Sequence, residues 1–185
     1  MQKSLFAAWL GIALAVPLAV PLAAHAEGSY VGINVGESKY DLAGEDESKT
    51  LIGLSYGTTI NPNFDIEAAY LRHGKIKGTD PVSGDSASFD TQSLYLAAVG
   101  KLPIAEGFHA FGKAGVALHY SDASLTTGGT TLSDSETKVG PMIGLGVSYQ
   151  FTKEISGVVE YQYFDKVIDD GPKLSSWSVG ARYHF

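Results

Sequence analysis

The last eight residues of the chain, SVGARYHF, alternate between apolar and polar side chains up to the final position. The two series are Val179, Ala181, Tyr183 and Phe185, and Ser178, Gly180, Arg182 and His184. A period of two predicts a β-strand with one apolar and one polar face. Because chain ends are usually frayed and polar, this ordered pattern predicts that the last strand is held in a sheet.

The same alternation recurs along the chain, and no stretch has a sustained helical period. The predicted strands cover residues 30–40, 50–59, 64–73, 89–101, 108–121, 137–151, 155–164 and 175–185. Eight such segments predict an all-β fold, an antiparallel up-and-down barrel of eight strands.

The first 26 residues have the features of a cleaved signal peptide. Lys3 gives a positive start, an uncharged apolar run follows, and Ala24 and Ala26 stand where signal peptidase needs small residues. An uncleaved membrane helix is the alternative, although it would have to contain Pro17 and Pro21. We therefore expect a signal peptide over residues 1–26 and a single barrel domain over residues 27–185.

Composition narrows the class of protein. The chain has 13 basic and 20 acidic residues, a formal net charge of −7 and no cysteine. No basic stripe is present, so we expect no nucleic-acid partner. An exported chain without disulfides must gain its stability elsewhere, and an extensive hydrogen-bonded sheet is one source.

The connections between the predicted strands alternate in length. The short ones cover residues 60–63, 102–107 and 152–154, and the long ones cover 41–49, 74–88, 122–136 and 165–174. In a meander, alternate connections lie at opposite ends. Short turns at one end and long loops at the other are typical of outer-membrane barrels.

The two faces of the strands differ in the size of their side chains. In the second strand Ile52, Leu54 and Tyr56 alternate with Gly53 and Ser55. A narrow eight-stranded barrel with small residues inside and bulky apolar residues outside fits a hydrocarbon surrounding. A lipocalin-like soluble barrel is the alternative, and it would need the reverse arrangement, with an apolar lining.

Four charged residues lie in the middle of predicted strands: Glu67, Lys113, Glu160 and Arg182. The period of two places all four on the small, inward face. Two acids and two bases can neutralise one another, so we predict a closed interior ionic cluster, with Lys101 and Gln162 as further members. The alternative is that some of these groups are hydrated near strand ends, Arg182 above all.

Aromatic residues gather near the ends of the predicted strands, as in the aromatic belts of membrane barrels. These residues are Tyr30, Tyr40, Phe64, Phe89, Phe108, Tyr149, Phe151, Tyr163, Trp177, Tyr183 and Phe185. In a soluble sheet the same residues would form a core, so this pattern alone decides nothing.

The opening EGSYVGINVG after the leader, VVEYQYF in the seventh strand and the closing SVGARYHF resemble the small eight-stranded outer-membrane barrels, the OmpA-like transmembrane domain and the OmpX, Ail and Opa type. The resemblance implies a Gram-negative outer-membrane location and contacts with lipid and lipopolysaccharide. It also implies that Tyr183 and Phe185 form a signal for the barrel-assembly machinery, with periplasmic chaperones as further partners.

The expected function is non-enzymatic. Four external loops would serve adhesion, other surface contact with a host or cell-surface ligand, or envelope integrity, and we expect a monomer without cofactor or metal. A filled lumen argues against a channel. The acidic residues Asp41, Glu45, Asp46 and Glu47 fit a solvated loop better than a cation site.

An enzymatic alternative rests on the sequence HYS. His119 and Ser121 resemble the His-x-Ser element of outer-membrane lipid A deacylases, with Glu136 as a possible third member of a triad. Asp122 stands where that family has Asn. The period of two also places His119 and Ser121 inside the barrel, away from lipid.

Overall fold

The computed structural model describes residues 28–42, 45–79, 86–127, 130–165 and 173–185. The predicted signal peptide, with Ala24 and Ala26, lies outside this part of the chain. Within the described ranges, no helix has the length and hydrophobicity needed to cross a membrane.

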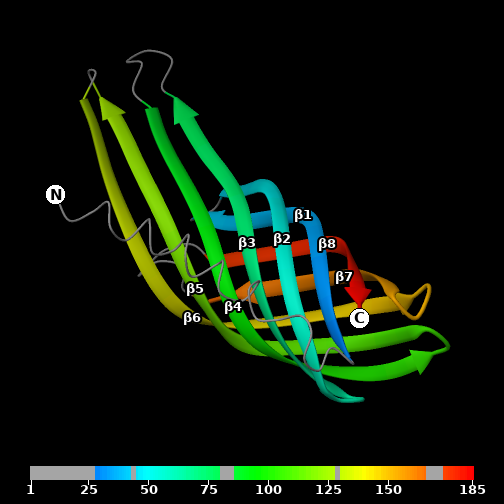
Figure 1. The fold of residues 1–185 in the computed structure, drawn as a ribbon. Helices are drawn as coiled ribbons and strands as arrows, with labels where there is room; N and C mark the ends of the chain where they lie inside the picture. Colours follow the sequence, from blue (N-terminus) through cyan, green and yellow to red (C-terminus); the bar gives the residue numbers. More distant parts are fainter. Residues whose placement is uncertain (1–27, 43–44, 80–85, 128–129, 166–172) are drawn as a thin grey trace.

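Eight antiparallel strands form a closed barrel in which each strand pairs with its neighbours in the sequence, as predicted (Figure 1). The strands are β1 (Ser29–Leu42), β2 (Glu45–Asn61), β3 (Phe64–Thr79), β4 (Ser86–Ala105), β5 (Phe108–Thr127), β6 (Thr130–Gln150), β7 (Ile155–Phe164) and β8 (Lys173–His184). Closure satisfies the backbone groups of both outer strands and removes the open edges that a flat sheet would leave.

The last strand closes the barrel against the first. β8 pairs with β1 from the Tyr30–His184 pair to the Asp41–Lys173 pair, and the Phe185 amide donates to the Ser29 carbonyl at 3.0 Å. Gly36 allows the close approach of these strands, because a Cβ there would overlap the carbonyl oxygen of Trp177. The alternation in the final segment therefore belongs to the strand that completes the ring.

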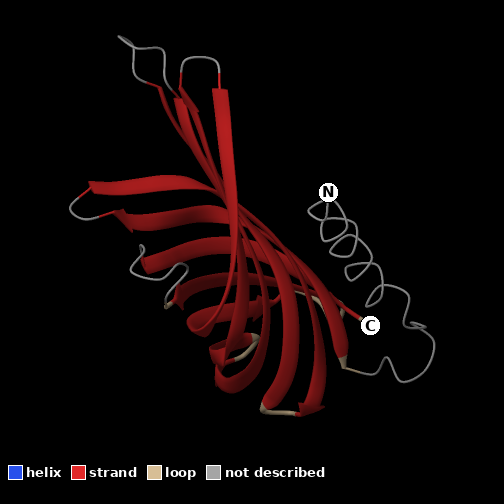
Figure 2. Cartoon of the chain, turned by 90° about the vertical axis from the view of Figure 1, so that its left-hand side faces the viewer, coloured by secondary structure: helices blue, strands red, loops and turns tan. Residues whose placement is uncertain are grey.

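The two ends of the barrel differ. The turn end carries the three short connections, residues 62–63, 106–107 and 151–154, and the C-terminus. The opposite end, the hairpin end, carries the β1–β2, β3–β4 and β5–β6 hairpins and the β7–β8 connection. Figures 1 and 2 show β3 to β6 rising well beyond the other strands at the hairpin end.

Three of the four predicted long loops are therefore largely wrong in extent. Residues 41–42, 45–49, 74–79, 86–88, 122–127 and 130–136 belong to the strands that these loops were expected to connect. The segments have little apolar alternation, so the sequence pattern did not identify them as strands. Their cross-strand hydroxyl pairs include Thr126 with Thr131 at 3.0 Å and Ser124 with Ser133 at 3.3 Å.

The outward face of the barrel is apolar, as predicted. Ile52 and Leu54 are 62% and 45% exposed, and Leu145 is 70% exposed, whereas Ser55 points inward and is buried. This arrangement is stable when acyl chains surround the barrel.

The interior is more apolar than predicted. Large inward side chains fill the hairpin-end half of the lumen, and they include Tyr40, Leu51, Leu71, Phe164 and Leu174. Tyr30 and Tyr40, predicted in the aromatic belt, point into the lumen and are 2% and 1% exposed, because they alternate in β1 with the outward Ile33 and Val35.

Candidate functional site in the barrel interior

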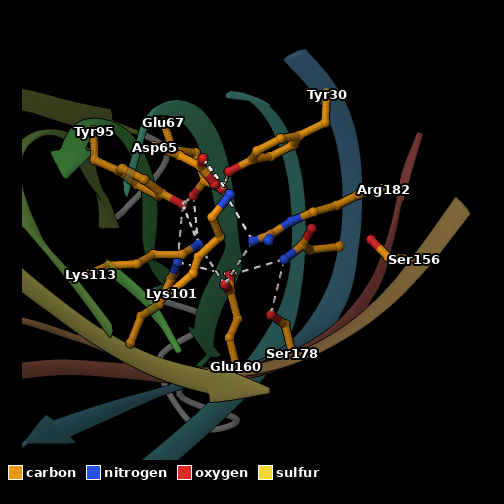
Figure 3. Close-up of polar contacts among 12 residues, drawn as sticks. Tyr30, Asp65, Glu67, Tyr95, Lys101, Lys113, Ser156, Glu160, Ser178 and Arg182 are labelled. Carbon is orange, nitrogen blue, oxygen red and sulfur yellow. Dashed lines mark hydrogen bonds and ion pairs between the residues drawn. The ribbon is translucent and has the colours of Figure 1, made fainter. Parts of the chain in front are cut away.

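Four strands bring the four predicted charged residues together inside the barrel (Figure 3). Glu67 comes from β3, Lys113 from β5, Glu160 from β7 and Arg182 from β8, and none is more than 5% exposed. We call these four residues the ionic cluster. Since the strands come from different sides of the ring, the cluster crosses the lumen.

Glu67 is the most connected member. Its Oε1 accepts hydrogen bonds from the Tyr95 hydroxyl and from Lys113 Nζ, both at 2.6 Å. Its Oε2 accepts from the Tyr30 hydroxyl at 2.6 Å and from Arg182 Nη2 at 3.2 Å. A buried carboxylate with four donors keeps its charge without water, because charge-assisted bonds replace its hydration.

Glu160 also accepts a hydrogen bond from the ammonium group of Lys113. Lys113 Nζ donates to its Oε2 at 2.6 Å, while Asn34 Nδ2 and Gln162 Nε2 donate to its Oε1 at 3.0 and 2.9 Å. Arg182 Nη2 lies 3.9 Å from Oε2. Lys113 therefore bridges the two acids. Gln162, which the sequence suggested as a further member, donates a hydrogen bond to the ionic cluster through Glu160.

Aromatic rings complete the surroundings of the two cations. The guanidinium of Arg182 lies 4.7 Å from the centre of the Tyr30 ring, and Lys113 Nζ lies 5.4 Å from that of Phe111. These contacts exclude water and add a favourable cation–π interaction. Two acids and two bases leave the cluster without net charge, which makes its burial tolerable.

Lys101 lies apart from the ionic cluster. Its Nζ donates to Asp65 Oδ1 at 2.6 Å, and Asp65 also accepts from the Thr59 hydroxyl at 2.8 Å. This ion pair lies closer to the turn end than the ionic cluster does, because Asp65 precedes Glu67 by two residues on β3. Lys101 therefore neutralises a third buried acid, Asp65, a role that the sequence did not reveal.

A second polar arrangement lies toward the hairpin end. The Ser38 hydroxyl contacts His73 Nδ1, His73 Nε2 contacts the Ser93 hydroxyl, and Ser93 contacts His119 Nδ1, each at 2.7 Å. We call these four residues the imidazole–hydroxyl chain. The Phe164 ring lies edge-on to both imidazoles, with ring centres 5.8 and 5.4 Å apart. Nothing in the sequence spacing of these four residues predicts this chain.

The HYS segment does not form the triad of a deacylase. His119 bonds to Ser93, whereas the Ser121 hydroxyl pairs with the Thr91 hydroxyl at 3.3 Å. Glu136 lies opposite Ser121 in the β5–β6 register, but Glu136 is exposed. His119 and Ser121 are buried inside the barrel, so no lipid substrate reaches them from the bilayer.

No group of three or more His, Cys, Asp or Glu residues is placed to hold a metal ion in the described ranges. In the predicted acidic loop, Asp41 lies opposite Asp46 in the β1–β2 register. Glu47 pairs with Lys49 at 2.6 Å. This part of the chain belongs to the β1–β2 hairpin rather than to a loop.

The two aromatic residues that end the chain lie at the turn end. Tyr183 points outward and is 51% exposed, and its ring stacks on that of Phe185 with centres 6.3 Å apart. Their position on the closing strand is compatible with an assembly signal. That role stays a prediction from the resemblance.

The chain matches the outer membrane protein beta-barrel domain family over residues 6–185. It is 27% identical over 171 residues to outer membrane protein A of Salmonella typhi, covering 84% of this chain and 48% of that protein. It is 28% identical over 139 residues to outer membrane protein A of Serratia marcescens, covering 71% and 38%. The chain thus spans about half or less of the length of these curated relatives.

Solved structures of two small surface proteins share the fold. Neisserial surface protein A superposes with a TM-score of 0.68 at 21% identity, covering 86% of this chain and 98% of that chain. Ail of Yersinia pestis, solved in complex with the heparin analogue sucrose octasulfate, superposes with a TM-score of 0.64 at 19% identity, covering 86% and 99%. At this identity the likeness establishes the barrel architecture alone.

Proposed function

The chain belongs to the outer membrane protein beta-barrel domain family, and from this premise we propose that it is a non-enzymatic protein whose barrel holds four connections at the cell surface. It is an integral β-barrel of the bacterial outer membrane. The proposal concerns what the barrel does there: its external hairpins make surface contacts, in adhesion or in maintaining the envelope.

The filled lumen carries the proposal. Glu67, Lys113 and their partners join strands across the barrel, and the apolar residues around Phe164 fill the space toward the hairpin end. A narrow eight-stranded barrel filled in this way has no room for solutes. The hairpin-end extensions of β3 to β6 are therefore the part of the molecule available for contacts, because they stand clear of the barrel (Figure 2).

We orient the barrel with the turn end in the periplasm, because bacterial outer-membrane barrels have short periplasmic turns and longer external connections. The C-terminal residues Tyr183 and Phe185 then enter the membrane from the periplasmic side. This fits the proposed recognition of the last strand by the barrel-assembly machinery after delivery by periplasmic chaperones. We expect a monomer, since closure leaves no strand of the membrane-spanning ring unpaired.

Binding experiments with cells that express the protein test which ligand the external hairpins contact. The Ail structure holds a heparin analogue, so sulfated glycans are one class of ligand to test. We expect no hydrolysis of lipid A. Mass spectrometry of lipid A from cells with and without the gene tests this expectation, and loss of an acyl chain that depends on Ser121 would contradict it.

Cysteine labelling in intact cells tests the orientation directly. The chain has no cysteine, so Thr126→Cys on the β5–β6 hairpin and Glu106→Cys in a short turn can each be labelled alone. We expect a membrane-impermeant maleimide to label T126C in intact cells and E106C only after lysis. The reverse pattern would refute the proposed function.

Shortening the hairpins tests their role. Replacement of residues 76–89 and 122–135 by short turns removes the extensions but keeps the membrane-spanning barrel, which we expect to migrate faster unboiled than boiled on a detergent gel. Adhesion or glycan binding by cells that express the shortened protein should fall to the level of cells without the gene. Full binding by the shortened protein would show that the contact lies elsewhere.

A further inference from the structure

The extensions of β3 to β6 beyond the barrel have two unlike faces. On one face, two cross-strand rows are apolar except for a single acid: Ile76, Phe89, Ala123 and Asp134, and then Gly78, Ala87, Leu125 and Leu132. The rows that alternate with them belong to the opposite face and are polar, with Asp90, Asp122 and Ser135 in one and Ser88, Ser124 and Ser133 in the other. Phe89 packs against the core of the lumen, so the apolar rows form the inner face of the extensions.

The inner face is apolar although it is exposed to water. The polar rows on the outer face indicate that this part of the sheet stands outside the hydrocarbon. Leu125 and Leu132 are nevertheless 49% and 69% exposed. Figures 1 and 2 show the extensions rising beyond the other labelled strands. Because a strand that is solvated on both faces needs no apolar residues, an exposed apolar face indicates a contact surface.

A groove on the inner face has the size of a small-molecule site. Its volume is about 560 Å³. The larger apolar side chains that line it are Ile76, Phe89, Leu125 and Leu132. Ala87 is small and leaves room between them. A ligand in this groove would remove apolar surface from water, which favours binding.

Asp134 gives the groove a negative charge. Among the described residues that line the groove, it alone is charged. The Ser135 amide donates to its Oδ1 at 3.0 Å, and the carboxylate keeps acceptor sites for a second donor. Glu136, the next acid along the inner face, lies 3.8 Å from Lys138 Nζ, so a neighbouring cation balances its charge. Asp134 is therefore the group that determines which charge a ligand can carry.

We propose that this groove binds small organic cations that have an apolar or aromatic body. The body lies against Phe89, Leu125 and Leu132, and the ammonium group donates to the Asp134 carboxylate. Phe89 on β4 and Asp134 on β6 belong to one cross-strand row. At a strand spacing of about 4.8 Å, their backbones are about 10 Å apart. An aromatic ring joined to an amine by a four-carbon chain matches this span.

The charge and the position of the groove exclude other amphiphiles. An anionic head group would lie next to the Asp134 carboxylate, where like charges repel. The acyl chains of the membrane do not compete for the groove, because the inner face does not face the bilayer. In the orientation of the proposed function, on which this inference rests for access from the medium, the groove lies outside the cell. The inference adds the chemical class of one ligand to the proposed surface contacts.

Methyl NMR of the folded protein in nanodiscs tests the site. Phenylbutylamine, phenylbutanol and phenylbutyrate share a ring and a chain and differ in charge, and each is titrated separately. We expect the methyl signals of Ile76, Leu125 and Leu132 to shift when the amine is added. The amine should bind about threefold to fivefold more tightly than the alcohol, as expected for one exposed ion pair, and the carboxylate should bind weakest.

Two variants separate charge from apolar contact. Asp134→Asn should abolish the advantage of the amine over the alcohol, whereas Leu132→Ser should weaken the binding of both. Both residues are exposed, so neither substitution removes packing from the core. The matched control is Asp122→Asn, which removes an acid from the outer face of the same extensions and should change neither affinity.

Equal affinities for the three probes, or an unchanged preference for the amine in D134N, would overturn the proposal. Shifts confined to the lipid-facing methyl groups of Leu54 and Val147 would show partition into the bilayer and would overturn it as well. Both sides of a nanodisc are open to the probes, so the titration does not depend on orientation in the cell. A reversed pattern of cysteine labelling refutes the proposed function, whereas the NMR outcomes refute the groove alone.

Discussion

The two halves of the lumen are filled by different chemistry. Toward the turn end, the ionic cluster joins β3, β5, β7 and β8 through buried charges. Toward the hairpin end, the imidazole–hydroxyl chain joins β1, β3, β4 and β5, and apolar side chains such as Phe164 and Leu174 fill the rest. Only the first arrangement ties together strands from all sides of the ring.

This difference has an energetic consequence. A neutral hydrogen-bonded chain loses a bond or two when one member is removed, and the remaining hydroxyls can turn toward other acceptors. An ionic cluster loses its charge balance, and the charges that remain are buried without compensation. Substitutions in the ionic cluster should therefore destabilise the barrel more than substitutions in the imidazole–hydroxyl chain.

The largest effect is expected for Glu67→Leu. The substitution leaves Lys113 and Arg182 with Glu160 as their remaining acid, so we expect a loss of about 3–5 kcal/mol in the free energy of unfolding. Urea unfolding in detergent micelles, followed by the fluorescence of Trp177, measures it. The control Glu106→Leu, in an exposed turn, should change stability little.

A double variant separates charge balance from lost packing. In Glu67→Leu with Lys113→Met, one acid and one base remain, so part of the stability lost in E67L should return. If the double variant is less stable than E67L, the cluster acts through the size of its side chains rather than through charge balance. The comparison of the two halves would then fail.

His73→Ala should have a smaller effect. The substitution removes the imidazole partner of Ser38 and one of the two imidazole partners of Ser93, and it leaves a cavity beside Phe164. We therefore expect a loss of about 2–3 kcal/mol in the free energy of unfolding. The same urea titration measures it, with His109→Ala near the turn end as the control. A loss as large as that of E67L would show that the two halves contribute alike.

The sequence was sufficient to predict the inward position of the ionic cluster. Side chains two residues apart in a strand point to the same face of the sheet. Because the residues next to Glu67 and Arg182 in the sequence are apolar and belong to the outward face, both charged residues were predicted to point inward. Closure of eight strands then brings inward residues of distant strands together. The partners of each charge could not be predicted, because they depend on the stagger between strands.

The imidazole–hydroxyl chain shows why stagger matters. His73, Ser93 and His119 all have inward positions in their strands, so the signal was present in the alternation. Ser93 lies opposite Leu71 in the ladder, however, and it contacts His73 diagonally. Nothing in the spacing of single residues fixes that diagonal contact.

The wrong predictions have separate physical causes. Tyr30 and Tyr40 lie near strand ends, which suggested a membrane belt, but their alternation with Ile33 and Val35 directs them inward. The strand extensions at the hairpin end were not predicted, because strands that are solvated on both faces have no apolar face and so show no apolar–polar alternation. A bulge between Arg72 and Lys75 also shifts the β3–β4 register, with Gly74 at a φ of +75°. Glycine adopts this conformation without steric cost, and the sequence pattern does not mark it as a bulge.

Tyr95→Phe should sharpen the comparison within the ionic cluster. Its hydroxyl donates to Glu67 at 2.6 Å and accepts from Gln162 Nε2 at 3.2 Å. We expect a loss of about 1–2 kcal/mol, since the charges stay balanced and one donor to the carboxylate is lost. Tyr30→Phe, which removes the other hydroxyl on Glu67, is the matched variant and should cost a similar amount. If either variant costs as much as E67L, hydrogen bonding rather than charge dominates the cluster.

The smallest effect is expected for conductance, because the two halves lie in series along the lumen. A variant that loosens one half leaves the other filled, so E67L and H73A should each show no resolved single-channel steps in planar bilayers, like the unmodified protein. Only a variant that combines both changes should raise the ion leak. Clear steps in E67L alone would mean that the apolar residues around Phe164 do not seal the hairpin end, whereas clear steps in H73A alone would mean that the charges do not seal the turn end.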